Sequence, residues 1–495
     1  MEAYSILLLI GILFFIICSF LTNKIIRLAI AAVGAMFFVA QATSLYFTQT
    51  FIGYQFYVHC NLNATKDFSY YFLFHILAAI ILFCILLFVF FKKSNFHKSR
   101  IFKILSIIYI VLSIIAICSN QKFRHDSSTL KSIFSNEALS FQNALNQNNM
   151  SDYTLARHIV CKNKSKRNII VLSLESYEKS FIEDKQFENL TPNLRQLKRN
   201  WHYYPLTPNI GSTWTSGSIY TYLTGFPAFF GIHGNSIFQS SYHTEITSVS
   251  QILKLTNHKT FFIIGNAEHS GLQDMLTTLF MDSIIDNRTF KNTYPESNYG
   301  LRDKDLFNIA KIVISEQKNN EQPFALFIST TDTHAPDGIY DKRMEDILNR
   351  KNYKNDLEFM VAAVDFMIAD FISFLKQENI LENTTLFIFP DHLKMGNPAM
   401  FKDCERGLFL LSNSSNDLLK IKDQNPIYQI DLPKIILNGA DIQHNAKFLT
   451  DYINSDISYL EKHIEKLTAI NINGLLRSDT IRIPKKFKNK SHFTN

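Results

Sequence analysis

The sequence predicts an α-helical membrane domain followed by an α/β domain with a mostly parallel central sheet. Two observations lead to this prediction. The first 120 residues contain long apolar segments without Asp, Glu, Lys or Arg, and from residue 167 onward apolar runs of strand length alternate with helical stretches. Strands that are apolar on both faces and alternate with helices are typical of a parallel sheet covered by helices. The chain of 495 residues is long enough for both domains.

Four segments in the first part of the chain are predicted to be transmembrane helices. A membrane span needs roughly 20 mostly apolar residues, with about 17 as the lower limit. A cleaved signal peptide is the alternative for the first segment, but that segment lacks a basic start and its apolar run is long for a signal peptide. Four such segments in succession also argue against buried helices of a soluble protein. The segments are residues 4–22, 28–49, 68–91 and 104–120, and they define a transmembrane domain over residues 1–120.

Basic residues between these segments predict the orientation of the chain. Loops that are rich in Lys and Arg face the cytoplasm. Such residues lie between the first and second segments and between the third and fourth. The N-terminus and all residues after 120 are therefore expected outside the cytoplasm. The basic residues are Lys24 and Arg27 in the first of these loops, and Lys92, Lys93, Lys98, Arg100 and Lys103 in the second.

The net charge and the cysteine content exclude few classes of function. The net charge of +7 includes the basic loops and a basic C-terminus, so it calls for no nucleic-acid partner. None of the six cysteines stands in a C-x-x-C pattern, which argues against thiol-bound zinc. Cys161 and Cys404 lie in the part expected outside the cytoplasm, where a disulfide between them is compatible with the compartment.

The remainder of the chain divides into three regions. Residues 121–166 are polar and compatible with helix, and two readings stay open: an amphipathic linker on the membrane surface, or an ordinary connecting helix. The α/β domain is expected over residues 167–445. Residues 446–495 carry no motif that suggests a function.

Five apolar runs in the α/β domain are predicted to be strands, and three segments between them helices. The last of these helices has apolar residues that recur with helical spacing. In such sheets ligands bind beyond the carboxyl ends of the strands, so residues that directly follow a strand are the first candidates for a site. The predicted strands are 168–174, 260–264, 324–329, 385–389 and 407–411, and the predicted helices are 246–256, 303–316 and 356–377.

Acidic and imidazole residues follow three of these predicted strands. Glu175 follows the first strand, Asp332 and His334 follow the third, and Asp391 and His392 follow the fourth. Because the carboxyl ends of parallel strands meet at one edge of a sheet, these side chains are expected to converge. Each of them alone has a plainer structural reading, such as a turn or a helix terminus, but their joint occurrence favours a functional site.

A hydroxyl residue completes the candidate set. Thr215 follows Trp214 in a turn rich in Gly and Ser, where a helix cap is the plainer reading. Two carboxylates, one imidazole and one hydroxyl can hold a divalent metal against a nucleophilic alcohol. A membrane anchor combined with a metal-activated threonine points to chemistry on lipid head groups.

Five motifs identify a family resemblance. They are VLSLES (171–176), LTPNLRQLK (190–198), GSTWTSGS (211–218), TTDTHAPDG (330–338) and PDHLKMGNPA (390–399). With these motifs the soluble domain resembles the sulfatase/alkaline-phosphatase superfamily. Within it, the domain is most similar to the phosphoglycerol transferases of periplasmic glucans, and also resembles lipopolysaccharide phosphoethanolamine transferases and lipoteichoic acid synthase. The resemblance covers about half of the chain.

The resemblance implies a role for each candidate residue. One divalent metal, Zn²⁺, Mn²⁺ or Mg²⁺, would be held by Glu175, Thr215, Asp391 and His392, with Thr215 also the nucleophile. His334 would be a catalytic residue that faces the transferred phosphoryl group, and Asp332 and Trp214 would contact the substrate. Lipoteichoic acid synthase has a Trp-Asn-Arg segment in the region that corresponds to residues 263–275, but this chain lacks the arginine. The head group therefore stays open between phosphoglycerol and phosphoethanolamine.

The expected function follows from these roles. A phospholipid donor would give its head group to an envelope glycan or lipopolysaccharide through a phosphothreonine intermediate. The enzyme would be a multi-pass protein of the bacterial inner membrane with a periplasmic catalytic domain. A sulfatase-like hydrolase of sulfate or phosphate esters is one alternative, but sulfatases derive formylglycine from C/S-x-P-x-R, and Thr215 is followed by Ser-Gly-Ser-Ile. A non-catalytic envelope scaffold is the other alternative, and the intact set of candidate residues argues against it.

Overall fold

The described residues form two compact units, residues 1–130 and 131–495. The structure is a computed structural model of the chain. It describes residues 2–21, 23–59, 77, 80, 81, 100–134, 140–163, 166–290, 293–414, 426–453 and 456–477.

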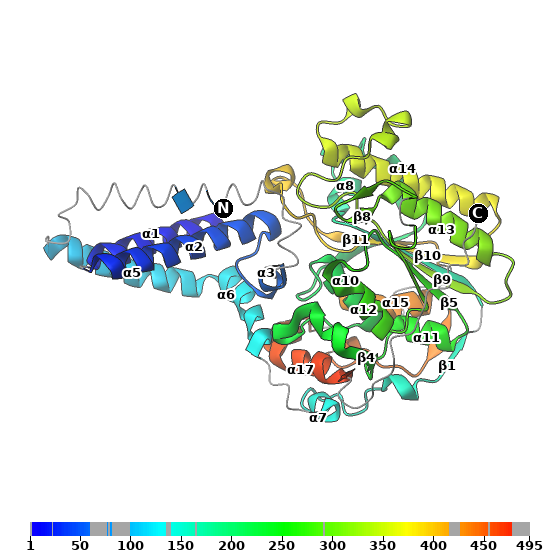
Figure 1. Ribbon diagram of the computed structural model, residues 1–495, viewed down its shortest axis with the longest axis horizontal. Coiled ribbons are helices and arrows are strands. Elements are labelled where there is room, and N and C mark those ends of the chain that lie inside the picture. Colours follow the sequence, from blue (N-terminus) through cyan, green and yellow to red (C-terminus); the bar gives the residue numbers. More distant parts are fainter. Residues whose placement is uncertain are drawn as a thin grey trace. The chain divides into compact units, whose positions relative to one another are not determined.

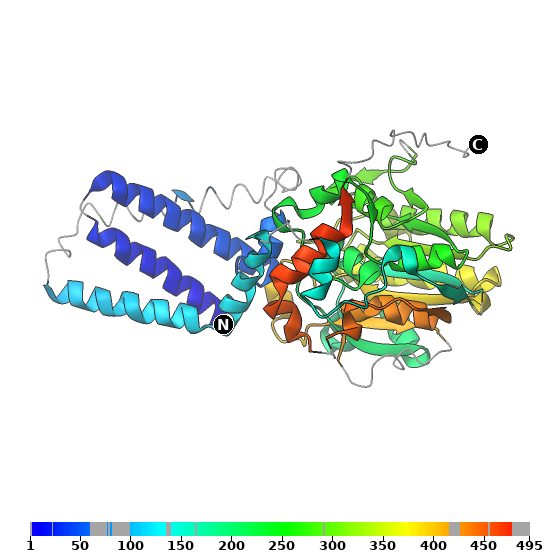
Figure 2. The same ribbon diagram turned by 90° about the horizontal axis from the view of Figure 1, so that it is seen from below.

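The first unit is built around three long apolar helices. They are α1 (Glu2–Phe20), α2 (Lys24–Thr48) and α5 (Arg100–Ser119). Helix α1 packs against both of the others, and Figure 2 shows the three side by side in blue and cyan. Asn23 caps α2, because its side chain accepts hydrogen bonds from the backbone N–H groups of Ile25 and Ile26 at 2.9 and 3.2 Å. Two shorter helices, α3 (Tyr54–His59) and α6 (Gln121–Ser128), lie in the same unit.

The four predicted transmembrane helices are not confirmed. Within the described residues, Ile25–Thr48 is the one helix that is long and apolar enough to cross a membrane. The segments Lys103–Ser119 and Gln121–Phe134 meet at a bend of 65°. They would form a second membrane span only if both belonged to one bent transmembrane helix. The apolar stretch of α1, Ala3–Cys18, is shorter. The predicted span at 68–91 lies almost wholly outside the described residues.

The second unit contains a mixed eight-stranded sheet. In spatial order its strands are β12 (Ile427–Tyr428), β3 (His202–Thr207), β11 (Leu408–Ser412), β10 (Thr384–Pro390), β2 (Asn168–Leu174), β9 (Phe324–Ser329), β5 (Lys259–Ile263) and β6 (Ser283–Ile285). The strands from β10 to β6 are parallel, and β11 runs antiparallel to both of its neighbours. The five predicted strands therefore exist within about one residue at each end, whereas β3, β6 and β12 were not predicted.

Helices cover both faces of this sheet. Figure 1 shows α13 and α14 on one side, and α10, α11 and α15 on the other. All three predicted helices exist, as α11, α13 and α14. The helices of the layers and their connections are α8 (Lys179–Glu183), α9 (Pro192–Asn200), α10 (Thr215–Thr224), α11 (Val249–Leu255), α12 (Leu272–Thr278), α13 (Asp303–Gln317), α14 (Asp356–Gln377) and α15 (Leu432–Gly439).

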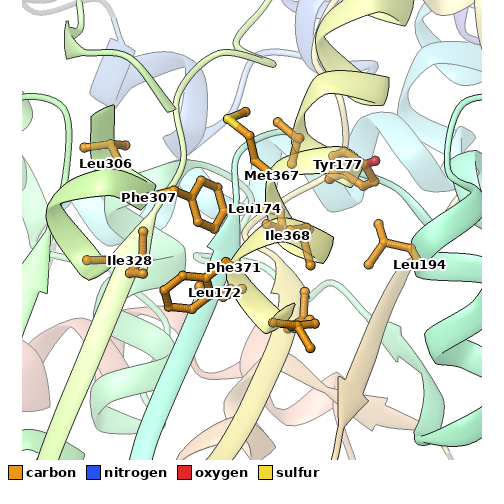
Figure 3. Packing of buried hydrophobic residues seen from close by; sticks show 14 of the residues in the cluster. Leu172, Leu174, Tyr177, Leu194, Leu306, Phe307, Ile328, Met367, Ile368 and Phe371 are labelled. Atoms are coloured by element: carbon orange, nitrogen blue, oxygen red, sulfur yellow. The ribbon is translucent and has the colours of Figure 1, made fainter. Parts of the chain in front are cut away.

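The central strands are apolar throughout because both of their faces are buried. Alternate side chains of β2, including Leu172 and Leu174, pack against α14 residues such as Ile368 and Phe371 (Figure 3). On the opposite face, the ring of Tyr222 from α10 contacts Phe327 of β9 and Phe389 of β10, with centroids 6.4 and 5.4 Å apart. This packing fixes α10, which carries the candidate nucleophile, against the middle of the sheet.

The C-terminal part of the chain supports α10 from outside the sheet. Helix α17 (Ile464–Gly474) contacts α7 (Phe141–Asn146), and β14 (Leu475–Arg477) pairs with β4 (Ser241–Thr244). Asn471 of α17 accepts a hydrogen bond from the hydroxyl of Tyr220 at 3.0 Å and donates to the carbonyl oxygens of Pro227 and Phe229. The described part of the C-terminal segment therefore packs into the second unit. The remaining elements there are β1 (Cys161–Asn163), β13 (Ile442–His444), β7 (Glu296–Ser297), β8 (Gly300–Leu301) and α16 (Ser458–Lys462).

The disulfide between Cys161 and Cys404 that the sequence left open is not formed. Both cysteines are free. The sulfur of Cys161 lies 3.9 Å from the carbonyl oxygen of Ile252 on α11, whereas the sulfur of Cys404 accepts a hydrogen bond from the side chain of Gln186 at 2.6 Å. The fold thus places the two thiols beside different helical segments.

Candidate active site

Two neighbouring parallel strands bring the candidate metal ligands together. Leu174 and Pro390, the last residues of β2 and β10, are partners in the register, so both strands end at the same level. The next residues, Glu175 and Asp391, therefore leave the sheet side by side, and the N–H of Asp391 donates to the carbonyl oxygen of Leu174 at 3.0 Å. Ligand atoms of Glu175, Asp391 and His392 lie within 4.8 Å of one another, and all three residues are buried.

Thr215 reaches this cluster from the first residue of α10. Its hydroxyl donates to Oε2 of Glu175 at 3.0 Å and lies 3.3 Å from Nε2 of His392. The preceding Trp214 is the N-cap of α10 without a side-chain cap bond, and its indole N–H donates to the hydroxyl of Ser216. A Cβ atom at Gly217 would lie 2.7 Å from the indole ring, so a glycine is needed for the tryptophan to lie over the first turn. The structure therefore brings all four predicted ligands together.

Backbone groups hold one side of the Asp391 carboxylate and leave the other side without a donor. Oδ1 accepts hydrogen bonds from the N–H groups of Ser176 and His392 at 2.9 and 2.7 Å. Ser176 can donate in this way because it adopts a left-handed conformation, with φ of 49°. Oδ2 is buried and accepts no hydrogen bond. A buried carboxylate oxygen without a donor is costly unless something else, such as a cation, compensates it.

A backbone carbonyl sets the orientation of the His392 ring. Nδ1 lies 2.9 Å from the carbonyl oxygen of Leu393, which assigns the ring hydrogen to that nitrogen. Nε2 then presents its lone pair at 3.5 Å from both Oε1 of Glu175 and Oδ2 of Asp391. Metal-binding histidines are commonly held in this way, with one nitrogen bonded to a carbonyl and the other directed at the ion.

The electrostatics of the cluster favour a divalent cation. Burial and the charge of Glu175 raise the pKa of Asp391 well above its usual range. Burial opposes ionisation of Glu175 as well, but the imidazoles of His392 and His334 hold its pKa at about 2. Two buried carboxylates at this separation repel each other when both are ionised, and a cation between them removes that repulsion. Two carboxylates, one imidazole and one hydroxyl form a donor set that fits such a cation.

His334 lies beside this cluster in the loop that follows β9. Its Nδ1 is 3.0 Å from the carbonyl oxygen of Ala335, so the hydrogen is assigned to Nδ1 and Nε2 remains for proton exchange. The ring of Tyr299, between β7 and β8, stacks on the imidazole with centroids 4.1 Å apart. Burial lowers the pKa of His334, although the charge of Glu175 opposes that shift.

Asp332 lies in a second buried cluster, in which charged and backbone groups already occupy its carboxylate. Arg302 donates from Nε to Oδ1 of Asp332 at 2.6 Å, and the N–H of Asp303 donates to Oδ2 at 3.1 Å. In return, the carboxylate of Asp303 accepts the N–H groups of Thr331 and Asp332 at 2.6 and 3.1 Å. The structure thus does not bring the Asp332 side chain into the Glu175 cluster. Instead, the Asp332 side chain links the loop that carries His334 to the start of α13.

Two further residues of the site were missed from the sequence. Gln429, just beyond β12, donates from Nε2 to the carbonyl oxygen of Asp391 at 2.6 Å and so supports the ligand from behind. Lys394 is almost fully buried, two residues beyond His392, and burial lowers its pKa to about 7. The PDHLKMGNPA motif contained Lys394, and a lysine so close to two candidate ligands was a usable signal. No signal in the sequence marked Gln429, because it lies far from the motifs along the chain.

Comparisons with known proteins agree with this geometry. The family model described as Sulfatase matches residues 167–456. The chain belongs to the sulfatase family. Among curated proteins, phosphoglycerol transferase I of Escherichia coli is 27% identical over 246 residues, which are 47% of this chain and 32% of that relative. The match therefore spans about a third of the relative's length. The proteins to which this chain is similar thus include a phosphotransferase.

Solved structures show the same fold. Lipooligosaccharide phosphoethanolamine transferase A from Neisseria meningitidis, an integral membrane protein, has a TM-score of 0.52 and 11% identity, covering 88% of this chain and 87% of that one. The lipoteichoic acid synthase LtaP from Listeria monocytogenes has a TM-score of 0.50 and 15% identity, covering 68% of this chain and 100% of that one. At these identities the likeness concerns the fold.

Proposed function

We propose that this protein transfers the head group of a phospholipid, phosphoglycerol or phosphoethanolamine, to an envelope glycan or lipopolysaccharide, with Thr215 as the nucleophile. The observation that carries the proposal is the position of the Thr215 hydroxyl, 3.0 Å from Glu175 and 3.3 Å from His392 in a cluster suited to a cation. The similarity to phosphoglycerol transferase I supports the reaction class. No nucleic acid takes part.

The residues that would hold the cation are Glu175, Thr215, Asp391 and His392, and Zn²⁺, Mn²⁺ and Mg²⁺ all suit the donor set. When bound, such a cation lowers the pKa of an alcohol and neutralises charge on phosphoryl oxygens. The protein side chains position the nucleophile. Thr215 begins a ten-residue helix, so the first N–H groups of α10 face the direction from which an anionic phosphoryl group would approach.

The first half of the proposed reaction moves the head group onto the enzyme. The oxygen of Thr215, whose proton has passed to solvent, attacks phosphorus as an alkoxide, and the bond from phosphorus to the diacylglycerol oxygen breaks. His334 gives a proton to the leaving oxygen, so that diacylglycerol departs as an alcohol and stays in the bilayer. Its lowered pKa makes the imidazolium of His334 a stronger acid for this step. The product is a phosphodiester on Thr215.

The second half transfers the head group to the acceptor. A sugar hydroxyl attacks phosphorus, His334 takes the hydroxyl proton, and the bond from phosphorus to Thr215 breaks, which returns the Thr215 oxygen to its starting alkoxide form. His334 thereby regains the proton that it gave away in the first half. Trp214 remains proposed as a substrate contact, whereas we propose that Asp332 acts on the substrate only indirectly, by holding the loop that carries His334. The enzyme would act in the bacterial inner membrane, with several spans and the catalytic domain in the periplasm.

The nucleophile can be tested by trapping the intermediate. Full-length protein in detergent is incubated with phosphatidylglycerol or phosphatidylethanolamine and no acceptor, and the peptide that spans residues 212–218 is analysed by mass spectrometry. We expect the head-group phosphate on Thr215 of the wild-type peptide and no adduct in Thr215→Ala. The mass added to the peptide identifies the head group. Thr215→Ser should retain part of the activity because its hydroxyl survives. An adduct on Thr213 or Ser216, or a fully active Thr215→Ala protein, would refute the assignment.

A further inference from the structure

Lys394 is a buried lysine whose amine has no carboxylate of the described residues within ion-pair distance. Its relative exposure is 1%, and its ammonium donates to the carbonyl oxygen of Met395 at 3.1 Å. Within the described part of the chain, no carboxylate oxygen lies within 4.0 Å of Nζ. Lys179, the other buried lysine among the described residues, forms an ion pair with Glu405. Because a buried ammonium is costly unless it is paired, an anion bound next to Nζ would stabilise the charged form of Lys394.

The carboxylates around Lys394 are already bound to other groups. Glu178 accepts hydrogen bonds from the guanidinium of Arg406 and from the backbone N–H of Lys394. Asp337 accepts a hydrogen bond from the side chain of Asn397 at 2.6 Å. Neither carboxylate forms an ion pair with the Lys394 ammonium.

Two loops enclose the position of Lys394. Asn397, three residues further on, donates to the carbonyl oxygen of Pro336 at 3.0 Å as well as to Asp337. The loop after β10, which carries His392 and Lys394, is thereby tied to the loop after β9, which carries His334. The charge of Glu175 acts on Lys394, and the charge of Lys394 acts on His334. The ammonium is therefore within electrostatic reach of both the candidate ligands and the proposed proton donor.

We infer that Lys394 binds a non-bridging oxygen of the phosphodiester during both half-reactions. This inference rests on the proposed function, because it requires a phosphoryl group at Thr215. A phosphodiester carries a negative charge that stays on its non-bridging oxygens when diacylglycerol leaves, so one ammonium serves the donor lipid and the phosphothreonine alike. An ammonium is a compact point charge with three donors and tolerates this change of orientation. Lys394 is thus a substrate-binding residue shared by both steps.

The inference is tested by binding of inorganic phosphate to the full-length, metal-loaded protein in detergent. Phosphate affinity is measured by calorimetry for wild type, Lys394→Met, Lys394→Gln and the matched control Lys179→Met. Lys179 is also buried and lies in the same part of the fold, but its ion pair faces solvent through Glu405, whose side chain is 87% exposed. Removing Lys394 should weaken phosphate binding about 10-fold or more, as expected for a lost charge-assisted hydrogen bond, and Lys179→Met should bind like wild type.

The bound metal and the phospholipid KM separate this role from a structural one. Both Lys394 variants should retain the metal content of wild type, and the KM for phospholipid should rise with the loss of phosphate affinity. Unchanged phosphate affinity in a folded Lys394→Met or Lys394→Gln protein, or loss of the metal from both, would overturn the inference. If wild type forms no adduct on Thr215, the proposed function itself fails. If wild type forms the adduct and both variants match it in phosphate affinity, only the role of Lys394 fails.

Discussion

Two clusters of buried carboxylates follow neighbouring strands, and they differ in how their oxygen atoms are satisfied. In the acid pair, Asp303 and Asp332, every carboxylate oxygen accepts a hydrogen bond from a backbone N–H or from Arg302. In the cluster of candidate metal ligands, Glu175, Asp391 and His392, hereafter the metal cluster, one oxygen of Asp391 accepts none. Both clusters are buried and both follow predicted strands. A buried carboxylate is therefore a candidate ligand when donors are missing, and a structural element when they are complete.

The strongest test of this comparison is to neutralise one member of each cluster. Asp391→Asn places an amide where the carboxylate oxygen without a donor lies. Bound metal and transfer activity should both fall by at least about 100-fold. Loss of a residue that only supports a metal ligand costs up to about 100-fold, and loss of a ligand itself should cost at least as much. Bound metal is measured by atomic emission after dialysis, and transfer by release of diacylglycerol. Asp303→Asn is the control and should retain its metal. Full metal occupancy in Asp391→Asn would show that the two clusters do not differ as described.

Removal of the metal should destabilise only a protein with an intact metal cluster. A ligand that binds only the folded state at 100 times its Kd adds about 2.7 kcal/mol to the free energy of unfolding. Addition of a chelator should therefore lower the unfolding temperature of the wild-type protein in detergent, and re-addition of the metal should restore it. Asp391→Asn should show almost no response to the chelator. An equal decrease in both proteins would place the stabilising metal elsewhere.

The acid pair should contribute to stability rather than to metal binding. Asp303→Asn loses one of the two acceptors that hold the N–H groups of Thr331 and Asp332, which leaves a buried donor unsatisfied. We expect a loss of about 1–3 kcal/mol in the free energy of unfolding, with unchanged metal content. Denaturant titration of the purified chain measures the first quantity and atomic emission the second. A decrease in bound metal with unchanged stability would reverse the roles of the two clusters.

Asp365 of α14 offers the smallest and most quantitative test, because it is a fully hydrogen-bonded carboxylate outside both clusters. It accepts the N–H groups of Asn193 and Leu194 at the start of α9, where the Thr191 side chain provides no cap. Burial raises the pKa of Asp365 to about 6 in the folded protein, above its ordinary value of 3.8. The folded state therefore binds the proton more tightly than the unfolded state, and the stability gained from this is lost as pH rises through 6.

This loss should amount to about 1 kcal/mol between pH 5 and pH 7. Other groups also titrate in this range, so the measurement is the difference between wild type and Asp365→Asn in unfolding free energy at each pH. The variant should lose less stability than wild type as pH rises. A steeper decline in the variant would mean that the ionised carboxylate is the form that stabilises α9.

The sequence predicted the parts of the molecule that depend on local pattern. The apolar runs of β2, β9 and β10 identified the central strands, and residues next to their ends identified Glu175, Asp391 and His392 as a group, which the structure brings together. Strand β3, which lies between the two-residue edge strand β12 and β11, was missed because HYYPLT contains a proline and polar residues. Asp332 looked like a site residue for the same reason as Asp391, since a strand end precedes each.

What distinguishes these two aspartates is the identity of distant partners. Asp332 pairs with Arg302, and the backbone of Asp391 is supported by Gln429. Neither partner lies in a motif or at a fixed spacing, so no pattern in the sequence connects them. The resemblance to membrane-anchored transferases supplied the role of Thr215, which its local sequence alone would describe as a helix cap.

The position of β2 in the middle of the sheet has a consequence for biosynthesis. Both of its neighbours come from much later in the chain, because β9 begins at Phe324 and β10 at Thr384. While the intervening residues are being made, the apolar segment Asn168–Leu174 has no partner strand, and unpaired apolar strands aggregate readily. The growing polypeptide therefore carries this segment without its partner strands until residue 390 has been synthesised. A chain that terminates before that point would lack the second partner of β2 together with Asp391 and His392, and we expect it to be inactive.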